Sequence, residues 1–204
     1  MRIAGLQPVS LCDYPGKVAA VVFTQGCNLR CPFCHNGGLI PVEGQGLIPQ
    51  EAGLNTLRGR SRLLDGVVIS GGEPTLQPDL PAFIHQVRDL GLSVKLDTNG
   101  TRPEVIEALL ANRLLDFIAM DVKAPFEKYP LLAGVDVPTT QIKASMGLVA
   151  ASGVDHEFRT TFVRPLLADD DLEQIRRSLP PSSRHKVQDF IAPLALDPGL
   201  RLAG

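Results

Sequence analysis

Short apolar runs alternate with longer segments of helical periodicity along the chain. Six runs rich in β-branched and other apolar residues predict strands over residues 18–24, 66–70, 92–97, 117–121, 157–163 and 187–191. The first two runs are continuously apolar, which is typical of strands that are covered on both faces in a parallel sheet. We therefore expect a largely buried, parallel sheet.

Helices are predicted between these strands, because apolar residues there recur three and four positions apart. Pro103 suits the first turn of one helix, Gly91 suits the end of another, and Asp169 places negative charge at the start of a third. The predicted helices cover residues 50–64, 79–90, a segment from 103, a segment from 139 or 140 to about 153, and a segment from 169. Repeated strand–helix units indicate an α/β fold with right-handed crossovers.

The length of the chain limits the architecture. A closed eightfold barrel takes about 250 residues, and this chain has 204. Six strands therefore favour a partial (β/α)6 barrel or a doubly wound sheet over a closed ring. We expect one domain over residues 1–204, with residues 194–204 as a short tail.

Charge and hydropathy exclude several classes of protein. The net charge is −2, and no stretch approaches the length of apolar residues that spans a membrane. This balance argues against a uniformly basic nucleic-acid surface and a strongly acidic tail, although it is compatible with a local basic patch. We expect neither a nucleic-acid partner nor a membrane partner. The first residues lack the pattern of an export signal, so we expect a cytoplasmic protein with reduced thiols.

The cysteines are clustered. Cys27, Cys31 and Cys34 lie in one loop, residues 26–36 (the cluster loop), whereas Cys12 stands alone. Soft thiolates suit an iron–sulfur cluster or zinc. A structural zinc site needs four ligands, usually as two separated pairs. Zinc could take His35 or Cys12 as its fourth ligand, but His35 follows Cys34 directly and Cys12 lies fifteen residues upstream of Cys27, so the spacing favours iron–sulfur. Three cysteines would leave one iron of a cubane cluster without a protein ligand. Cys12 is expected to be a packed thiol rather than a fourth ligand.

Further polar residues follow the other predicted strands, and the carboxyl ends of parallel strands meet at one mouth. They are Gly71, Gly72 and Glu73 after the second strand, Asp97, Thr98 and Asn99 at the third, Asp121 and Lys123 at the fourth, and Arg159 in the fifth. Each has a structural alternative: paired glycines and Asn-Gly are common in turns, and a lysine is commonly solvated. Arg159 lies in a strand otherwise rich in Thr, Phe and Val, where a buried charge needs a partner.

Together, these residues resemble the sequence motifs of a known enzyme family. Cys-x3-Cys-x2-Cys with Phe33 before the last cysteine resembles the cluster motif of the radical S-adenosylmethionine (radical SAM) enzymes, whose fold is a full or partial barrel. Further blocks, from about residue 6 to 175, are similar to the anaerobic ribonucleoside-triphosphate reductase activating proteins, relatives of the pyruvate formate-lyase activating enzymes. These blocks are Asp13-Tyr14-Pro15-Gly16-Lys17, Leu96-Asp97-Thr98-Asn99-Gly100, Met120-Asp121-Val122-Lys123 and Glu157-Phe158-Arg159-Thr160-Thr161.

The resemblance implies two cofactors, a [4Fe-4S] cluster on Cys27, Cys31 and Cys34 and S-adenosylmethionine on its open iron. It implies that the backbone from Phe33 to His35 meets the adenine. The implied contacts to the rest of S-adenosylmethionine are Gly71, Gly72, Glu73, Asp97, Thr98, Asn99, Asp121, Lys123 and Arg159. The pyruvate formate-lyase activating enzyme also holds a monovalent cation on residues that match Asp97 and Thr98. The match to this cation site is incomplete, because Ala119 stands where that enzyme has a methionine ligand.

The implied activity is reductive cleavage of S-adenosylmethionine to a 5′-deoxyadenosyl radical, which generates a glycyl radical on a partner enzyme. The implied partner is the anaerobic ribonucleotide reductase, and the electron would come from flavodoxin or ferredoxin. Alternatives are activation of another glycyl-radical enzyme, a radical reaction on a small molecule, or a non-catalytic zinc or iron–sulfur binding protein. The cluster and S-adenosylmethionine would supply the chemistry, so no catalytic acid or base is expected.

Overall fold

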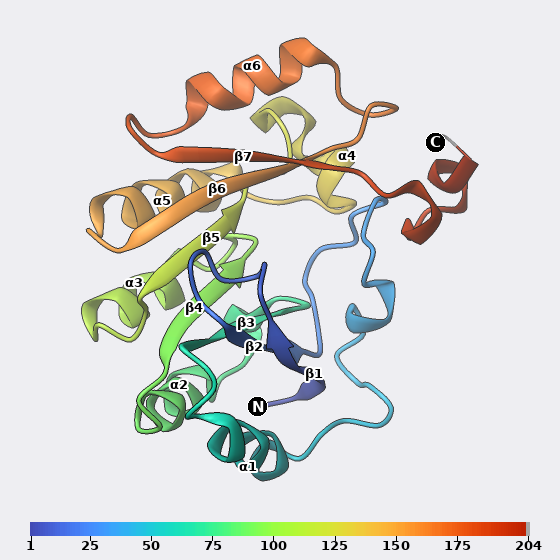
Figure 1. Cartoon of the computed structure of the whole chain (residues 1–204). Helices are drawn as coiled ribbons and strands as arrows, with labels where there is room; N and C mark the ends of the chain where they lie inside the picture. The colour runs from blue at the N-terminus through green and yellow to red at the C-terminus, as the bar shows by residue number, and fades with distance from the viewer. Residues whose placement is uncertain (203–204) are drawn as a thin grey trace.

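A computed structural model describes residues 1–202 and contains one seven-stranded sheet (Figure 1). The strands follow one another in chain order across the sheet, β1-β2-β3-β4-β5-β6-β7. Their bounds are Ile3–Ser10, Ala19–Thr24, Gly66–Gly71, Ser93–Thr98, Phe117–Asp121, Asp155–Phe162 and Arg184–Asp189. Strands β2 to β7 pair in parallel, which confirms the six predicted strands with shifts of up to three residues at their ends.

The first strand was not predicted. β1 runs antiparallel to β2, with irregular register between Ile3 and Gly5 and between Gln7 and Ser10. Its sequence contains Gly5 and Pro8, residues that disfavour a regular strand, and its middle is partly exposed. An edge strand tolerates both residues because its outer side carries no ladder hydrogen bonds.

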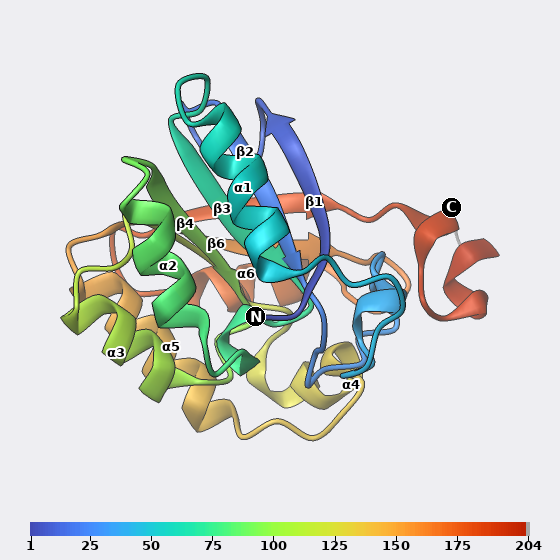
Figure 2. The ribbon, with the colours of Figure 1, turned by 90° about the horizontal axis from the view of Figure 1, so that it is seen from below.

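The main helices follow the outer face of the curved sheet (Figure 2). They are α1 (Gln50–Arg60), α2 (Leu80–Arg88), α3 (Pro103–Ala111), α5 (Thr139–Ala151) and α6 (Asp169–Ser178). All five were predicted, and the structure adds the short α4 (Tyr129–Ala133). Single 3-10 turns lie at Gly37–Leu39, Pro74–Leu76, Phe126–Lys128, Ala192–Leu194 and Pro198–Leu202. The sheet and helices confirm the expected α/β partial barrel.

The central strands, β2 to β5, are buried on both faces of the sheet. On the outer face, alternate strand residues such as Val22, Ile69 and Leu96 pack against the helices in one large apolar cluster. The inner face holds a small cluster of Tyr14, Ala19, Val21, Val68, Phe117 and Ala119. Because successive side chains point to opposite faces, Met120 belongs to the outer cluster and Ala119 to the inner one.

The segment after β7 packs on the cluster loop. The Asp197 amide donates to the Pro32 carbonyl at 2.8 Å, and the Phe190 ring stacks on His35 with centroids 6.0 Å apart. Of the predicted tail over residues 194–204, the last two residues lie outside the described part of the chain. Within residues 1–202, no helix has the length and apolar character needed to cross a membrane.

Candidate functional site

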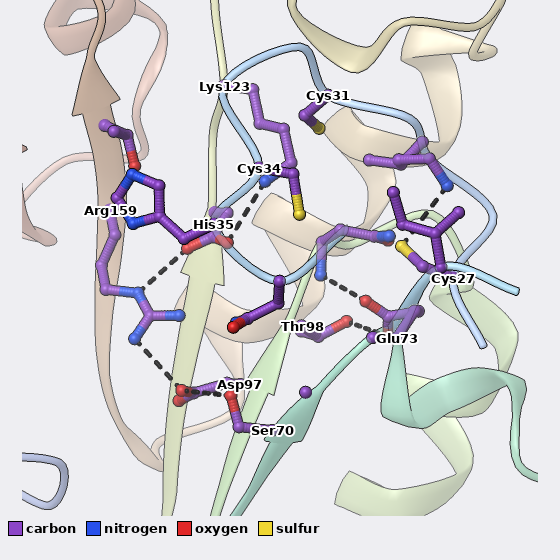
Figure 3. A pocket seen from close by; sticks show the side chains of 18 of the residues that line it. Cys27, Cys31, Cys34, His35, Ser70, Glu73, Asp97, Thr98, Lys123 and Arg159 are labelled. Atoms are coloured by element: carbon purple, nitrogen blue, oxygen red, sulfur yellow. Dashed lines mark hydrogen bonds and ion pairs between the residues drawn. The ribbon is translucent and has the colours of Figure 1, made fainter. Parts of the chain in front are cut away.

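One cavity of about 470 Å³ opens at the carboxyl ends of the parallel strands. Every residue that the sequence singles out as a metal or cofactor ligand lines it (Figure 3). These are Cys27, Phe33, His35 and the other two cysteines of the cluster loop, Gly71, Gly72 and Glu73 after β3, Asp97, Thr98 and Asn99 at β4, Asp121 and Lys123 after β5, and Arg159 on β6. Segments far apart in the sequence therefore share one cavity wall.

Backbone hydrogen bonds fix the cluster loop between two other segments. Gly26 and Cys27 donate from their amides to the carbonyls of Leu39 and Ile40, at 2.8 and 3.0 Å. On the other side, the Arg30 amide donates to the carbonyl of Ala133, at the end of α4, at 2.9 Å. These backbone hydrogen bonds therefore define the shape of the loop.

The three thiols lie around this loop and turn toward the cavity (Figure 3). Burial raises the pKa of Cys27 to about 11, although the Leu29 amide donates to its sulfur at 3.4 Å. Burial also raises the pKa of Cys31, and the positive charge of Lys123 opposes that shift. Because metals bind the thiolate, loading of the loop must release these protons.

Cys12 is exposed, so the expectation of a packed thiol is wrong. It lies in the turn after β1, where its sulfur is 3.5 Å from the Ser10 hydroxyl. The turn ends in Pro15-Gly16. Within it, Cys12 is exposed to solvent, whereas the neighbouring Asp13 lines the cavity.

The donor set fits an iron–sulfur cluster. It consists of three soft thiols on a loop whose Leu29 and Phe33 are buried, and thiolates are the usual ligands of such clusters. Across residues 1–202, no group of three or more His, Cys, Asp and Glu side chains is placed to hold a single metal ion. His35 is exposed and stacks on Phe190 rather than turning back onto the cysteines.

Glu73 is buried and joins two strand ends. Its Oε1 accepts hydrogen bonds from the amide and hydroxyl of Thr75 and from the Thr98 hydroxyl, and its Oε2 accepts the Asn99 amide at 2.7 Å. Burial raises the pKa of this carboxyl group, and the hydrogen bonds from Thr75, Asn99 and Thr98 oppose the shift. Oε2, with one protein donor, keeps acceptor capacity for the ammonium group of a ligand.

Gly72 is required by a close approach to the cluster loop, whereas a Cβ atom on Gly71 would lie 2.4 Å from the Thr24 amide nitrogen on β2. A Cβ atom on Gly72 would lie 2.2 Å from the carbonyl oxygen of Gly26. The next residue binds the same carbonyl oxygen: the Glu73 amide donates a hydrogen bond to the Gly26 carbonyl at 2.8 Å. The glycines therefore form a tight turn and also line the cavity, because this turn brings the end of β3 against the cluster loop.

Charged side chains form a chain across the floor of the cavity (Figure 3). Arg159 donates to Asp121 at 3.0 Å and to Asp97 at 3.3 Å, and Lys123 donates to Asp121 at 3.3 Å. Burial opposes ionisation of Asp121, but Arg159 and Lys123 hold its pKa below the ordinary value. The guanidinium of Arg159, 14 % exposed, thus has the ion-pair partners expected from the sequence. Lys123, only 12 % exposed, is not a solvated lysine.

Several residues of the cavity wall were not predicted. Asp13, Ser70 and Thr161 line the cavity with Asn36 and Gln188. Strand alternation could have indicated Thr161, which lies two positions after Arg159 on the same face of β6. Ser70 donates to Asp97 at 3.1 Å across neighbouring strands, a pairing that depends on sheet order and has no local signal.

Comparison with known proteins extends these observations. A family model described as "Radical SAM superfamily" matches residues 21–179. A protein of Methanocaldococcus jannaschii, named "Putative glycyl-radical enzyme activating enzyme MJ1227", is 37 % identical over 193 residues, covering 92 % of this chain and 79 % of that protein. A Clostridium pasteurianum "Pyruvate formate-lyase-activating enzyme" is 33 % identical over 127 residues, covering 60 % of this chain and 52 % of that enzyme.

The fold is also found in solved structures. The crystal structure of Streptococcus suis SuiB bound to S-adenosylmethionine superimposes with a TM-score of 0.64, at 17 % sequence identity. The match covers 82 % of this chain and 39 % of SuiB. The chain therefore spans about half of the Clostridium enzyme and less than half of SuiB.

Proposed function

The chain belongs to the radical SAM superfamily and is homologous to glycyl-radical enzyme activating enzymes; we propose that it generates a glycyl radical on a partner protein, the anaerobic ribonucleoside-triphosphate reductase. The cofactors of the family are a [4Fe-4S] cluster and S-adenosylmethionine. The observation that carries the proposal is the single cavity shared by the cysteine loop and the charged strand ends. Its volume of about 470 Å³ lies within the usual range of small-molecule sites.

We assign the parts of the cavity as follows. Cys27, Cys31 and Cys34 hold the cluster, which supplies an electron to cleave S-adenosylmethionine into methionine and the 5′-deoxyadenosyl group that abstracts hydrogen. Glu73, together with the backbone of Gly71 and Gly72, receives the methionine ammonium. Phe33 and His35 lie beside the adenine, and the contacts to the carboxylate and ribose come from Asp97, Thr98, Asn99, Asp121, Lys123 and Arg159.

The charges support this assignment. Lys123 and Arg159 are donors fixed by carboxylates at the cavity floor, and charged donors of this kind make strong hydrogen bonds to a carboxylate or hydroxyl. The ion pairs with Asp97 and Asp121 orient these side chains, and preorganised groups lose little conformational entropy on binding. The protein would thus orient one carbon of the cofactor toward one hydrogen of the substrate.

The sheet supports a protein as the substrate. β1 and β7 are the two edges of the sheet and do not pair with each other, so the barrel is open on one side. A loop that carries a glycine could reach the cavity from that side. We treat residues 1–204 as one radical SAM domain, in the cytoplasm, where the four free cysteines stay reduced.

The electron would come from a separate protein. The chain has four cysteines, three of them at the cavity and Cys12 outside it, so it has no ligands for a second cluster of the ferredoxin type. We propose flavodoxin or ferredoxin as the donor. Activation of another glycyl-radical enzyme uses the same cavity and is the principal alternative, followed by a radical reaction on a small molecule.

Anaerobic reconstitution with iron and sulfide tests the chemistry. With S-adenosylmethionine and dithionite, we expect equal amounts of methionine and 5′-deoxyadenosine. Cys27→Ala should abolish both products and lower the bound iron, because it removes a cluster ligand. Cys12→Ala is the matched control and should behave as the wild type, because Cys12 is exposed and outside the cavity. Stoichiometric zinc without cleavage of S-adenosylmethionine would contradict the proposal.

A further inference from the structure

A closed ring of hydrogen bonds connects the cluster loop to the end of β4. Asn28 directly follows Cys27 in the loop, whereas Asn99 and Thr101 lie in the turn after β4. Nδ2 of Asn99 donates to Oδ1 of Asn28 at 2.9 Å, and Nδ2 of Asn28 donates to the Thr101 hydroxyl at 2.8 Å. The Thr101 hydroxyl donates in turn to Oδ1 of Asn99 at 2.7 Å. We call these three side chains the Asn28 ring.

One backbone amide fixes the direction of every hydrogen bond in the Asn28 ring. The Thr101 amide donates to the side chain of Asn99 at 3.0 Å. Because a backbone N–H can only donate, the Asn99 atom that it meets is the oxygen, and the other terminal atom is the nitrogen. That nitrogen requires an oxygen on Asn28, which leaves the nitrogen of Asn28 to donate to Thr101. The opposite orientation would place two donors against each other.

The ring leaves the Asn99 side chain with one free donor. Its Oδ1 accepts from both the amide and the hydroxyl of Thr101, which occupies the two lone pairs of an amide oxygen. One Nδ2 hydrogen binds Asn28, and the other has no partner among residues 1–202. The backbone of Asn99 is also held, since its amide donates to Glu73. Asn99 lines the cavity, so a ligand there meets an oriented N–H and must offer it an acceptor oxygen.

The Asn28 ring is not the main anchor of the cluster loop. Backbone hydrogen bonds already join Gly26 and Cys27 to residues 39–40 and join Arg30 to the end of α4, and Asn28 itself is exposed. The effect that belongs to the ring alone is therefore the orientation of the Asn99 amide.

We propose that Asn28 and Thr101 are positioning residues, which hold Asn99 so that its free N–H binds an acceptor oxygen of S-adenosylmethionine. The inference rests on S-adenosylmethionine as the ligand in the proposed function. Asn28 and Thr101 do not line the cavity, so both act through Asn99. The ligand carries acceptor oxygens on its carboxylate and on its ribose, and either oxygen suits an amide donor.

Equilibrium dialysis of radiolabelled S-adenosylmethionine against reconstituted protein, without reductant, tests this role. Asn28→Leu removes both polar groups of the side chain, and Thr101→Val replaces the hydroxyl with a methyl group. Each variant should bind about 5-fold more weakly, because one oriented hydrogen bond to the ligand is lost. Thr101→Ser retains the hydroxyl and should bind as the wild type does. The double variant should bind about as weakly as either single variant, because both changes open the same ring.

Asn112→Leu is the matched control. Asn112 is also exposed, and its Nδ2 also donates a hydrogen bond, to the Ala108 carbonyl at 2.7 Å, but it lies at the end of α3 and does not line the cavity. This variant should bind S-adenosylmethionine as the wild type does. Decarboxylated S-adenosylmethionine identifies the acceptor oxygen. Weakening that persists with this analogue assigns the N–H to a ribose hydroxyl, and weakening that disappears assigns it to the carboxylate.

Hydrogen exchange of the Asn99 side-chain amide in the metal-free chain is a second readout, which needs no cofactor. Nuclear magnetic resonance should show slow exchange in the wild type and in Thr101→Ser. Exchange should be faster in Asn28→Leu and in Thr101→Val, because the opened ring no longer holds Nδ2 of Asn99.

The outcomes separate this inference from the proposed function. Wild-type-like binding by Asn28→Leu and Thr101→Val would overturn the positioning role, and so would unchanged exchange of the Asn99 amide in both variants. Thr101 lies outside the cluster loop, so Thr101→Val and Thr101→Ser decide the result even if Asn28→Leu fails to fold or to take up iron. A wild type that binds no S-adenosylmethionine would instead refute the proposed function.

Discussion

The Glu73 carboxylate joins two of the strand ends that form the cavity. Three of its four protein hydrogen bonds come from Thr75 and Asn99, and the fourth comes from Thr98. The donors are backbone amides and hydroxyls in a buried setting, so they require an acceptor. The same residue anchors the cluster loop through its own amide, which donates to the Gly26 carbonyl. One side chain therefore holds the shape of the cavity wall.

Glu73→Gln should destabilise the chain. A glutamine has one acceptor oxygen and turns its amide N–H groups toward a donor such as the Asn99 amide, leaving buried donors without partners. We expect the free energy of unfolding of the metal-free chain to fall by about 2 kcal/mol, as measured by urea denaturation. Glu107→Gln, which removes an exposed carboxylate on α3, is the control. Equal stabilities of the two variants would contradict this role of Glu73.

His185 on β7 gives a pH dependence. The Thr160 hydroxyl donates to the Val122 carbonyl at 2.7 Å, so it accepts from Nε2 of His185 at 2.9 Å. Nδ1 is buried and has no hydrogen-bond partner among the described residues. Burial, together with the positive charge of Arg176, lowers the pKa of His185. Protonation would place a proton on Nδ1 where nothing accepts it.

The lowered pKa of His185 determines how the free energy of unfolding changes with pH. The neutral ring stabilises the fold above pH about 6.5, the value in the unfolded chain, and this contribution is lost as the pH falls toward the lower folded value. Because His185 is partly exposed, solvent screening limits the effect to about a few tenths of a kcal/mol. Urea unfolding at pH 7.5 and 5.5 should show a smaller pH dependence in His185→Gln than in the wild type. The exposed His85→Gln should retain the dependence; its loss there would contradict the assignment.

The sequence identified the charged residues and cysteines that line the cavity, but it did not identify their hydrogen-bond and ion-pair partners. Cys27, Asp97 and Arg159 stand out because each follows or interrupts an apolar run. Lys95 did not stand out, since one lysine in a strand is usually a solvated residue. Lys95, which pairs with Asp97, is buried because β3 and β5 flank it in the sheet. No local sequence pattern shows which strands will lie next to it.

At the scale of elements, α4 supports the cluster loop. The helix ends at Gly134, whose φ of 68° is in the left-handed region. A Cβ atom there would lie 2.1 Å from the carbonyl oxygen of Arg30, and the Arg30 amide in turn donates to Ala133. The end of α4 and the loop that carries the cysteines are therefore in direct backbone contact.

Gly134→Ala should displace the cluster loop. The methyl group meets a backbone atom, which can move only with the loop, and alanine is strained at this φ. We expect a loss of about 1–3 kcal/mol in the free energy of unfolding and less iron per chain after reconstitution. Gly147→Ala is the control, because that glycine lies inside α5 with nothing within 4 Å, and alanine favours a helix by about 1 kcal/mol. Unchanged iron content in Gly134→Ala would contradict this support.

Elements with strong periodicity were predictable, and short or irregular ones were not. α2 and α3 have clear apolar stripes, with proline at the start of each. α4 has five residues, too few to show a period, and it follows directly on a 3-10 turn. β1 alternates weakly around Gly5 and Pro8. These elements depend on contacts with distant segments rather than on local propensity.

At the scale of the whole molecule, the chain is an open barrel. Seven strands leave β1 and β7 as free edges, while the cavity lies at the carboxyl ends of the parallel strands between them. A closed barrel would need about 250 residues. The length of the chain thus predicted an incomplete barrel, whereas the position of the segment after β7, which packs on the cluster loop, was accessible only from the structure.

The central claim is that the reduced, reconstituted protein removes a hydrogen atom from a glycine of a partner protein. The direct measurement is electron paramagnetic resonance of an anaerobic mixture of this protein, S-adenosylmethionine, dithionite and the anaerobic ribonucleoside-triphosphate reductase. We predict a doublet signal that collapses to a singlet when the reductase is made with α-deuterated glycine. Cleavage of S-adenosylmethionine without any glycyl signal, on this reductase or on other glycyl-radical enzymes, would contradict the account.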